Sequence, residues 1–201
     1  ARVPLDKLTI IGAGLLGGSV GLAARARGLA KRVSALVRRP ESVAECQALG
    51  VADEVTLDPA EAAAGADLIV LCTPISGMAG LAKRTLPHLK PDAVVTDVGS
   101  TKQQLVAELT PLCAGAAAHF VGSHPMAGSE QTGPAAARAD LFDGTVCVVT
   151  PTGDTHAGAL ATVNDFWAGL GSQPVVMPAD THDRLVARCS HLPHLLASAL
   201  A

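Results

Sequence analysis

A histidine follows the end of an apolar run, where a side chain could reach a ligand. His124 comes after the strand-like run 119–122 and directly before Pro125, in a loop rich in glycine and hydroxyl residues. Histidine can take up a proton near neutral pH, so an imidazole held in this loop could act as a general base. The alternative is a structural histidine whose ring only makes hydrogen bonds within the loop. We favour the catalytic interpretation.

A serine follows the preceding apolar run, 93–97. The Ser100 hydroxyl could orient a histidine or a substrate hydroxyl in the same cleft. Thr101 and Gln104 have the spacing of a capping box, which would give this loop a purely structural role at the start of a helix. Lys102 could contact a phosphate or a carboxylate, or lie in solvent.

Two further histidines, His191 and His194, are three residues apart and therefore share one face of a helix. They could line a site. Pro193 between them removes a backbone donor and should kink or open the helix locally. A metal site is the alternative, but no third ligand with suitable spacing is evident, and we predict no metal.

A glycine fingerprint precedes all of these residues. Gly12, Gly14 and Gly17 form the pattern G-x-G-x-x-G, which includes Leu15 and Leu16 and follows the apolar run Leu8–Ile11. In that context the glycines allow a tight turn, close approach of a pyrophosphate and close packing of helix on strand. The alternative is a turn that only aids packing. We predict a dinucleotide site, to which Thr73 and Pro74, after a later strand, also contribute.

The second strand ends in arginines where dinucleotide sites usually carry an acid for the adenosine ribose. Arg38 and Arg39 follow Val37, and no carboxylate is available there. Guanidinium groups recognise phosphate bidentately, so we predict a preference for NADP, with NAD as the weaker alternative. The other interpretation is that both arginines are solvated at the strand end.

Strand-like runs alternate with alanine-rich helical stretches, which is typical of a parallel sheet covered by helices on both faces. The sequence therefore predicts an α/β fold with a doubly wound, mostly parallel Rossmann-type sheet, in which the loops after the strands converge on one cleft. A helix is expected at about 155–170. The expected strands are 8–11, 33–37, 68–72, 93–97, 119–122, 146–150 and 174–177.

From residue 180 onward the pattern becomes a long helix with an apolar stripe formed by Leu185, Cys189, Leu192 and Leu196. The chain ends inside this pattern, so we expect a fragment, in which residues 179–201 are the first helix of an all-helical dimerisation domain and residues 1–178 are the dinucleotide-binding domain.

Composition narrows the class of protein. The 201 residues carry a net charge of −3, which gives no basic field for nucleic acid. Five scattered cysteines and a charged start without a secretory signal favour a reduced, cytoplasmic setting.

The uncharged stretch 8–24 approaches the length of a membrane span, but its glycines follow the fingerprint, so no membrane association is expected. The absence of tyrosine excludes a tyrosine-dependent dehydrogenase, and no G-x-S-x-G elbow is present.

Three motifs together resemble the prephenate/arogenate dehydrogenase family of tyrosine biosynthesis. They are the segments 97–102 (DVGSTK), 122–130 (GSHPMAGSE) and 190–194 (SHLPH), in this order after the glycine fingerprint. The resemblance covers nearly the whole chain. It implies oxidative decarboxylation of prephenate or arogenate, in which hydride passes to the nicotinamide and loss of carbon dioxide aromatises the ring.

The same resemblance implies roles for individual residues. His124 matches the catalytic histidine that accepts the proton of the substrate hydroxyl, and Ser100 matches the serine that orients this histidine. His194 matches a histidine that lines the substrate pocket, with His191 beside it. Ser129 and Glu130 match loop positions that contact or gate the substrate.

The chain departs from the family in two places. Members that use NAD carry an acid where this chain has Val37, and Arg38 resembles the members that use NADP. The family also continues into a helical domain that forms a homodimer and supplies an arginine for a substrate carboxylate. We therefore expect this chain to bind cofactor but to turn over poorly by itself.

Two rival interpretations remain open at this stage. One is another enzyme of the β-hydroxyacid dehydrogenase type, and the other is a nucleotide-sensing module without catalysis. The sequence also leaves open the choice between prephenate and arogenate and any inhibition by tyrosine.

Overall fold

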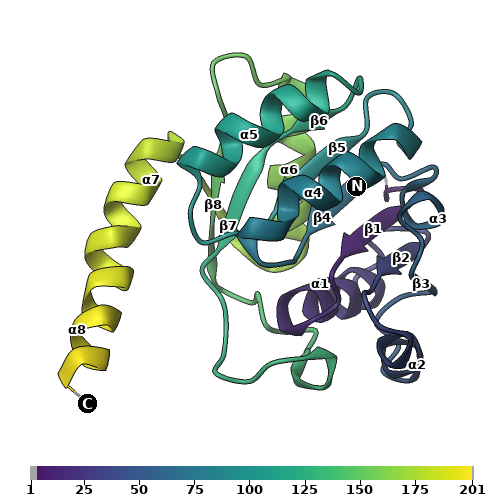
Figure 1. The fold of residues 1–201 in the computed structure, drawn as a ribbon, viewed down its shortest axis with the longest axis horizontal. Helices are drawn as coiled ribbons and strands as arrows, with labels where there is room; N and C mark the ends of the chain where they lie inside the picture. Colours follow the sequence, from purple (N-terminus) through teal and green to yellow (C-terminus); the bar gives the residue numbers. More distant parts are fainter. Residues whose placement is uncertain (1–3, 201) are drawn as a thin grey trace.

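A computed structural model describes residues 4–200 of the chain. Its centre is a six-stranded parallel sheet with the order β3-β2-β1-β4-β5-β6 (Figure 1). The chain builds outward from β1 to β3 on one side and from β4 to β6 on the other, so the strand order reverses between β1 and β4. This confirms the doubly wound Rossmann-type sheet. The strands are β1 (Leu8–Ile11), β2 (Val33–Leu36), β3 (Glu54–Thr56), β4 (Leu68–Leu71), β5 (Val94–Asp97) and β6 (His119–Phe120).

The expected strand 119–122 is wrong as a single strand. The chain leaves the parallel sheet after β6 and enters a second, three-stranded sheet in which β7 (Gly122–Pro125) pairs antiparallel with β8 (Val146–Thr150). β8 in turn pairs in parallel with β9 (Gln173–Val176). The physical reason is that both strands of this apolar run are buried, so the change of sheet leaves no break in its hydrophobic pattern. His124 therefore lies on a strand of the second sheet and not in a loop.

Helices cover both faces of the main sheet because the strand side chains alternate between two cores. Leu8 and Ile10 of β1 join the core on one face, while Ile11 joins the core on the other. The first face carries α1 (Leu15–Ala26), α2 (Pro40–Ala48) and α6 (Ala157–Gly169), and the second carries α3 (Pro59–Ala63), α4 (Ile75–Thr85) and α5 (Gln103–Ala114). Short 3₁₀ turns lie at Leu86–His88 and Pro134–Ala136.

The C-terminal helical segment projects from this body (Figure 1). It consists of α7 (Ala179–Val186), a π-helical turn (Ala187–His191) and α8 (Leu192–Leu200). The opening expected near Pro193 takes the form of this π turn, which ends two residues before the proline. In a π turn each N–H reaches one residue further back, which is one way for a helix to absorb a proline.

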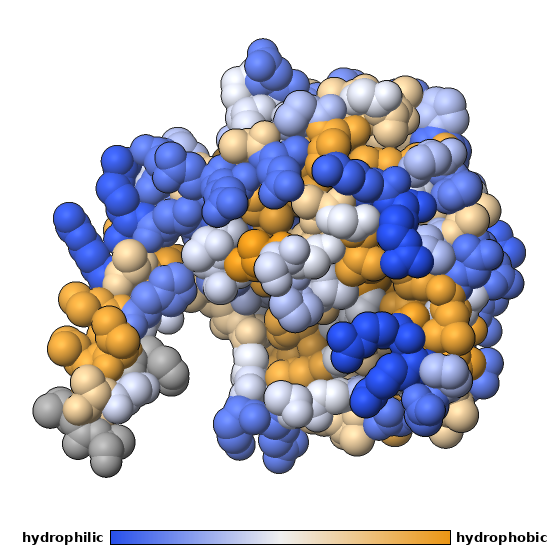
Figure 2. Space-filling model, viewed as in Figure 1, coloured by the Kyte–Doolittle hydropathy of each residue, from blue (hydrophilic) through white to orange (hydrophobic). Residues whose placement is uncertain are grey.

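The apolar stripe of this segment is exposed. Leu185, Leu192 and Leu196 are each at least half exposed, as is Leu195. Figure 2 shows hydrophobic side chains gathered on the projecting α8. Such a contiguous apolar face is typical of a surface that another element covers.

None of the helices within residues 4–200 has the length and hydrophobicity needed to cross a lipid bilayer.

Candidate functional site

Three adjoining cavities form one cleft along the carboxyl ends of the parallel strands. The first, of about 520 Å³, is lined by the ends of β1 and β2, and it shares Thr73 and Pro74 with the second, of about 770 Å³. The second shares Ser100 and His124 with the third, of about 970 Å³, which reaches the π turn and α8. The cleft crosses the point where the strand order reverses, as expected for an open α/β sheet.

The glycine loop between β1 and α1 is shaped to admit a bulky group. Gly12 has φ +95°, and a Cβ at Gly17 would lie 1.9 Å from the carbonyl oxygen of Gly12, so neither position tolerates a side chain. Gly14 is the N-cap of α1 and lines the second cavity. A Cβ at this position would have no atom within 4 Å. The free N–H groups at the start of α1 attract an anion. The loop therefore fits a pyrophosphate.

The first cavity has a positively charged rim. Arg38, exposed after β2, and Arg84 of α4 both line it, and none of its lining residues is acidic. Arg39 is also exposed, at the N-cap of α2, but does not line this cavity. Sequence reasoning missed Arg84, because nothing in its spacing relates α4 to the end of β2. The arrangement suits an extra phosphate on an adenosine ribose.

His124 lies where the second and third cavities meet. Burial is the main cause that lowers the pKa of His124 from 6.5 to about 4, and electrostatic interactions with His182, Lys102 and His191 act in the same direction. The imidazole is therefore neutral at pH 7 and has a lone pair available for a proton. This is the protonation state that a general base needs.

A second histidine holds the ring of His124 from behind. Nδ1 of His124 lies 2.9 Å from Nε2 of His182, which is fully buried on α7. Nδ1 of His182 lies 2.8 Å from Oδ1 of Asp183. Sequence reasoning missed both residues, although an adjacent histidine and aspartate at the start of the last helix were a visible signal.

The expectations for the Ser100 loop are met only in part. Ser100 is exposed and lines both cavities with His124, but the structure has no hydrogen bond between the two side chains, both of which lie in the described part of the chain. The Thr101–Gln104 capping box is wrong. Asp183 instead accepts hydrogen bonds from the backbone N–H groups of Lys102 (2.7 Å) and Gln103 (2.9 Å), because a carboxylate from α7 reaches the start of α5.

Lys102 does not reach the cleft. Its side chain is fully buried, forms an ion pair with Asp97 and donates a hydrogen bond to the carbonyl oxygen of Ser123 (2.8 Å). Asp97 also accepts the N–H groups of Gly99 (2.7 Å) and Ser123 (3.0 Å). The expectation that Lys102 binds substrate is corrected: it joins β5 to β7 from inside the protein.

Of the remaining candidates, His191 is the one that the structure places at the third cavity among the residues it describes. The side chain of His194 lies outside the described part of the structure. Ser129 and Glu130 are exposed in the loop after β7, where the Ser129 hydroxyl lies 3.4 Å from Oε2 of Glu130. Gly128, just before them, lines the cavity, but these two residues do not. Within the described residues, no group of three metal-binding side chains is found.

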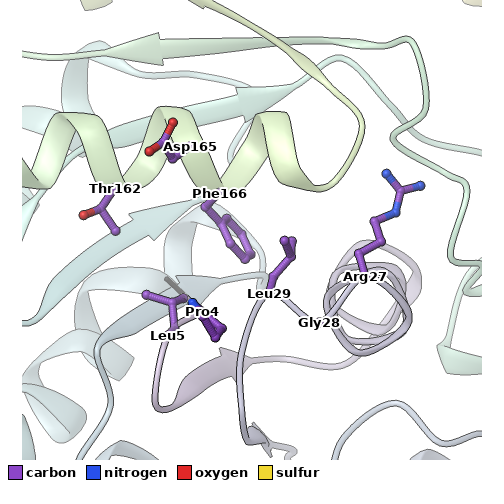
Figure 3. A pocket seen from close by; sticks show the side chains of 8 residues that line it. All are labelled: Pro4, Leu5, Arg27, Gly28, Leu29, Thr162, Asp165 and Phe166. Carbon is purple, nitrogen blue, oxygen red and sulfur yellow. The ribbon is translucent and has the colours of Figure 1, made fainter. Parts of the chain in front are cut away.

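A different cavity, of about 310 Å³, lies at the opposite, amino end of β1, between the end of α1 and α6 (Figure 3). Leu29 and Phe166 line it with apolar surface, and Arg27 at its side is paired with Asp143. None of the candidate residues contributes to it.

Comparisons with known proteins agree with this geometry. Residues 20–176 match the sequence model of a family described as prephenate dehydrogenase, nucleotide-binding domain. A cyclohexadienyl dehydrogenase of Zymomonas mobilis is 38% identical over 192 residues, which cover 94% of this chain and 64% of that protein. The chain thus spans less than two thirds of this relative.

Two solved structures share the fold closely. Prephenate dehydrogenase of Aquifex aeolicus, in complex with hydroxyphenyl propionate and NAD⁺, superposes with a TM-score of 0.92 at 31% identity, covering 100% of this chain and 69% of that one. A Synechocystis arogenate dehydrogenase gives a TM-score of 0.87 at 32% identity, with coverage of 96% and 67%.

Proposed function

The chain belongs to the prephenate dehydrogenase family, and from this premise we propose that the protein oxidatively decarboxylates prephenate or arogenate, with NADP as the preferred cofactor. In this reaction the ring carbon that bears the hydroxyl loses a hydride, and the ring becomes aromatic as carbon dioxide leaves. The observation that carries the proposal is the position of a neutral, half-buried His124 where the glycine-loop cavity meets a second large cavity.

The cleft fits a dinucleotide, which supplies the hydride acceptor when it is bound. Gly14 and the start of α1 would hold the pyrophosphate, since a Cβ at Gly14 would meet nothing within 4 Å. Leu15, Leu16, Thr73 and Pro74 line the same cavity and would flank the rest of the cofactor. Gly12 and Gly17 keep the turn closed behind it.

His124 acts as the general base in this proposal. Its neutral imidazole accepts the proton of the substrate hydroxyl as hydride leaves the same carbon, so that no alkoxide charge accumulates in a poorly solvated site. Ser100 lines the same cavities and is placed to donate or accept a hydrogen bond at that hydroxyl. This gives Ser100 a role toward the substrate.

The substrate occupies the third cavity. His191 lines it, and a ring N–H of this histidine can donate a hydrogen bond to a carboxylate, which suits a dicarboxylate or an amino acid with a ring carboxylate. We assign His194, one helical turn further along, to the same pocket on the strength of the family motif. Ser129 and Glu130 directly follow Gly128, which lines the cavity, and would contact the substrate if their loop closed over it.

The preference for NADP rests on Arg38. It lines the cavity at the end of β2, with Arg84 on the same cavity and no acid among the lining residues. Guanidinium groups favour the 2′-phosphate, and an acid that would favour the ribose hydroxyls of NAD is missing. Arg39 adds positive charge next to the cavity.

The proposal extends to the organisation of the whole protein. We place the dinucleotide-binding domain at residues 1–178 and the first helix of a helical dimerisation domain at 179–201; the exposed leucines of α8 support a homodimer through that domain. A cytoplasmic location is supported by five free cysteines.

The test has two parts. Titration of this chain with NADP and NAD should give the tighter dissociation constant with NADP. The complete protein should then reduce NADP with prephenate or arogenate and release carbon dioxide. Turnover of a simple β-hydroxyacid in place of both substrates would favour the rival enzyme class, and cofactor binding without any turnover would favour a sensing module.

A further inference from the structure

Three side chains form a line of hydrogen bonds that ends at the cleft. His124 on β7 contacts His182 (2.9 Å), and His182 contacts Asp183 (2.8 Å), both on α7. His182 is fully buried and the Asp183 side chain is about one quarter exposed. His124 lines the second and third cavities, whereas neither His182 nor Asp183 is among their lining residues.

The position and charge of Asp183 are fixed by α5. Its two oxygens accept the N–H groups of Lys102 and Gln103, the first free donors of that helix. Burial works to raise the pKa of Asp183, but the N–H of Gln103, the ring of His182 and the N–H of Lys102 outweigh it and hold this pKa below its usual value. Asp183 is therefore an anion near neutral pH and can only accept hydrogen bonds.

The negative charge of Asp183 determines where the hydrogens lie along this line of side chains. Since Asp183 can only accept, Nδ1 of His182 carries a proton and donates it to Oδ1. In a neutral His182 the other nitrogen, Nε2, is then a bare acceptor, so Nδ1 of His124 must donate to it. The remaining nitrogen of a neutral His124, Nε2, is left with its lone pair free.

We propose that His182 and Asp183 are positioning residues that lock His124 into the tautomer with a proton on Nδ1 and a free lone pair on Nε2. The proposal deepens the assignment of His124 as the general base and, in its catalytic meaning, rests on the proposed function. In this tautomer Nε2 of His124 can accept a substrate proton. The carboxylate of Asp183, on the other side of the His182 ring, stabilises the imidazolium that forms when His124 takes up that proton.

The contact connects a buried histidine to a residue that lines the cleft. A buried histidine needs partners for its two nitrogens, and His182 has Asp183 on one side and, on the other, the ring of His124, which lines both cavities. If His182 carried protons on both nitrogens, it would donate to His124 instead. His124 would then hold its proton on Nε2 and could not act as a base.

The direct test is the tautomeric state of His124 in this chain, measured by long-range ¹H–¹⁵N correlation NMR on histidine-labelled protein at neutral pH. The His124 signals are assigned by their loss in His124→Gln. We expect the nitrogen shift of a protonated Nδ1 and an unprotonated Nε2. A proton on Nε2, or an equal mixture of tautomers, would overturn the proposal without any assay of activity.

Two variants separate positioning from packing. His182→Gln keeps a side-chain oxygen that can accept from His124 and an amide that can donate to Asp183, so the Nδ1–H tautomer should persist. His182→Leu fills the buried space with no acceptor, and His124 should then populate both tautomers. An unchanged His124 tautomer in folded His182→Leu would show that His182 only packs.

In the complete protein, kcat should fall about tenfold in His182→Leu, a part of the roughly 10²–10⁴-fold that a general base contributes, and recover in His182→Gln, while the KM for the cofactor stays the same. Equal kcat values in His182→Leu and His182→Gln would show that the contact between His124 and His182 does not contribute to catalysis. If the tautomers behave as expected but neither prephenate nor arogenate is turned over, the positioning stands and the proposed function fails.

Discussion

The rings of His124 and His182 meet edge to face, with centroids 5.1 Å apart and planes at 75°. This contact joins a strand of the second sheet to the first helix of the C-terminal segment, 58 residues later in the chain. Asp183 strengthens the same junction by capping α5. The segment from residue 179 is therefore part of the site at its start, although its later apolar stripe is exposed.

The buried position of His124 predicts a stability that depends on pH. Because the pKa of His124 is about 4 in the folded protein against an ordinary value of 6.5, the unfolded chain binds a proton more readily between these values. The free energy of unfolding should therefore fall as the pH drops from about 6.5 toward 4. Urea denaturation across this range should show a smaller fall for His124→Gln, which cannot titrate; an identical fall in both proteins would contradict the shifted pKa.

Gly14 and Gly80 provide a matched pair of glycine substitutions. Nothing lies within 4 Å of a Cβ at either position, so Gly14→Ala and Gly80→Ala should both fold, with stability changes within about 1 kcal/mol. Of the two glycines only Gly14 lines the cleft, so only Gly14→Ala should weaken NADP binding. The expected loss of binding free energy is about 1–3 kcal/mol, because the added methyl group would crowd the bound pyrophosphate. Calorimetric titration measures both; equal affinities would mean that the pyrophosphate does not approach this glycine.

The buried pair Lys102–Asp97 predicts a loss of stability rather than of affinity. Lys102→Met removes the cation and leaves Asp97 as a buried carboxylate without its ion-pair partner, which costs about 3–5 kcal/mol. Chemical denaturation should show this loss, and the folded fraction should bind NADP normally. Unchanged stability with a raised KM for substrate would restore Lys102 to the substrate site.

Arg38→Ala should separate the two cofactors. Loss of a charged hydrogen bond to the 2′-phosphate costs about 1.5–3 kcal/mol, so the dissociation constant for NADP should rise roughly 10- to 150-fold, while that for NAD stays nearly constant. Arg39→Ala, which removes the same charge from a side chain outside the cavity, should have a smaller effect. Equal weakening of NADP and NAD by Arg38→Ala would refute the phosphate contact.

Local patterns predicted the parts of this protein that depend on neighbours in sequence. The glycine loop, the strand Leu8–Ile11 and the strand Val146–Thr150 lie where the sequence places them, because each is a short apolar run bounded by turn residues. β3 was missed because its three residues are polar or partly exposed and carry no strand-like hydrophobicity. The change of sheet after β6 was missed because both strands are buried.

The candidate site was predictable only at its strand ends. His124 and Ser100 were chosen as candidates because they follow apolar runs, and both line the cleft. The burial of Lys102 was not predictable, because it depends on Asp97 and on the carbonyl of Ser123, 21 residues away. The contact of His182 with His124 joins two residues that are 58 positions apart, and the cap that Asp183 places on α5 joins residues about 80 positions apart. Patterns among neighbouring residues cannot predict such contacts.

We propose that His124 takes the substrate proton in an NADP-dependent dehydrogenase. The most direct measurement compares kcat of the complete protein and of its His124→Gln variant with prephenate and with arogenate, alongside the dissociation constant for NADP. We expect kcat of the variant to fall by a factor of roughly 10²–10⁴ while the dissociation constant for NADP stays the same. A variant that keeps kcat within about tenfold of the parent, below the range for loss of a general base, would contradict it.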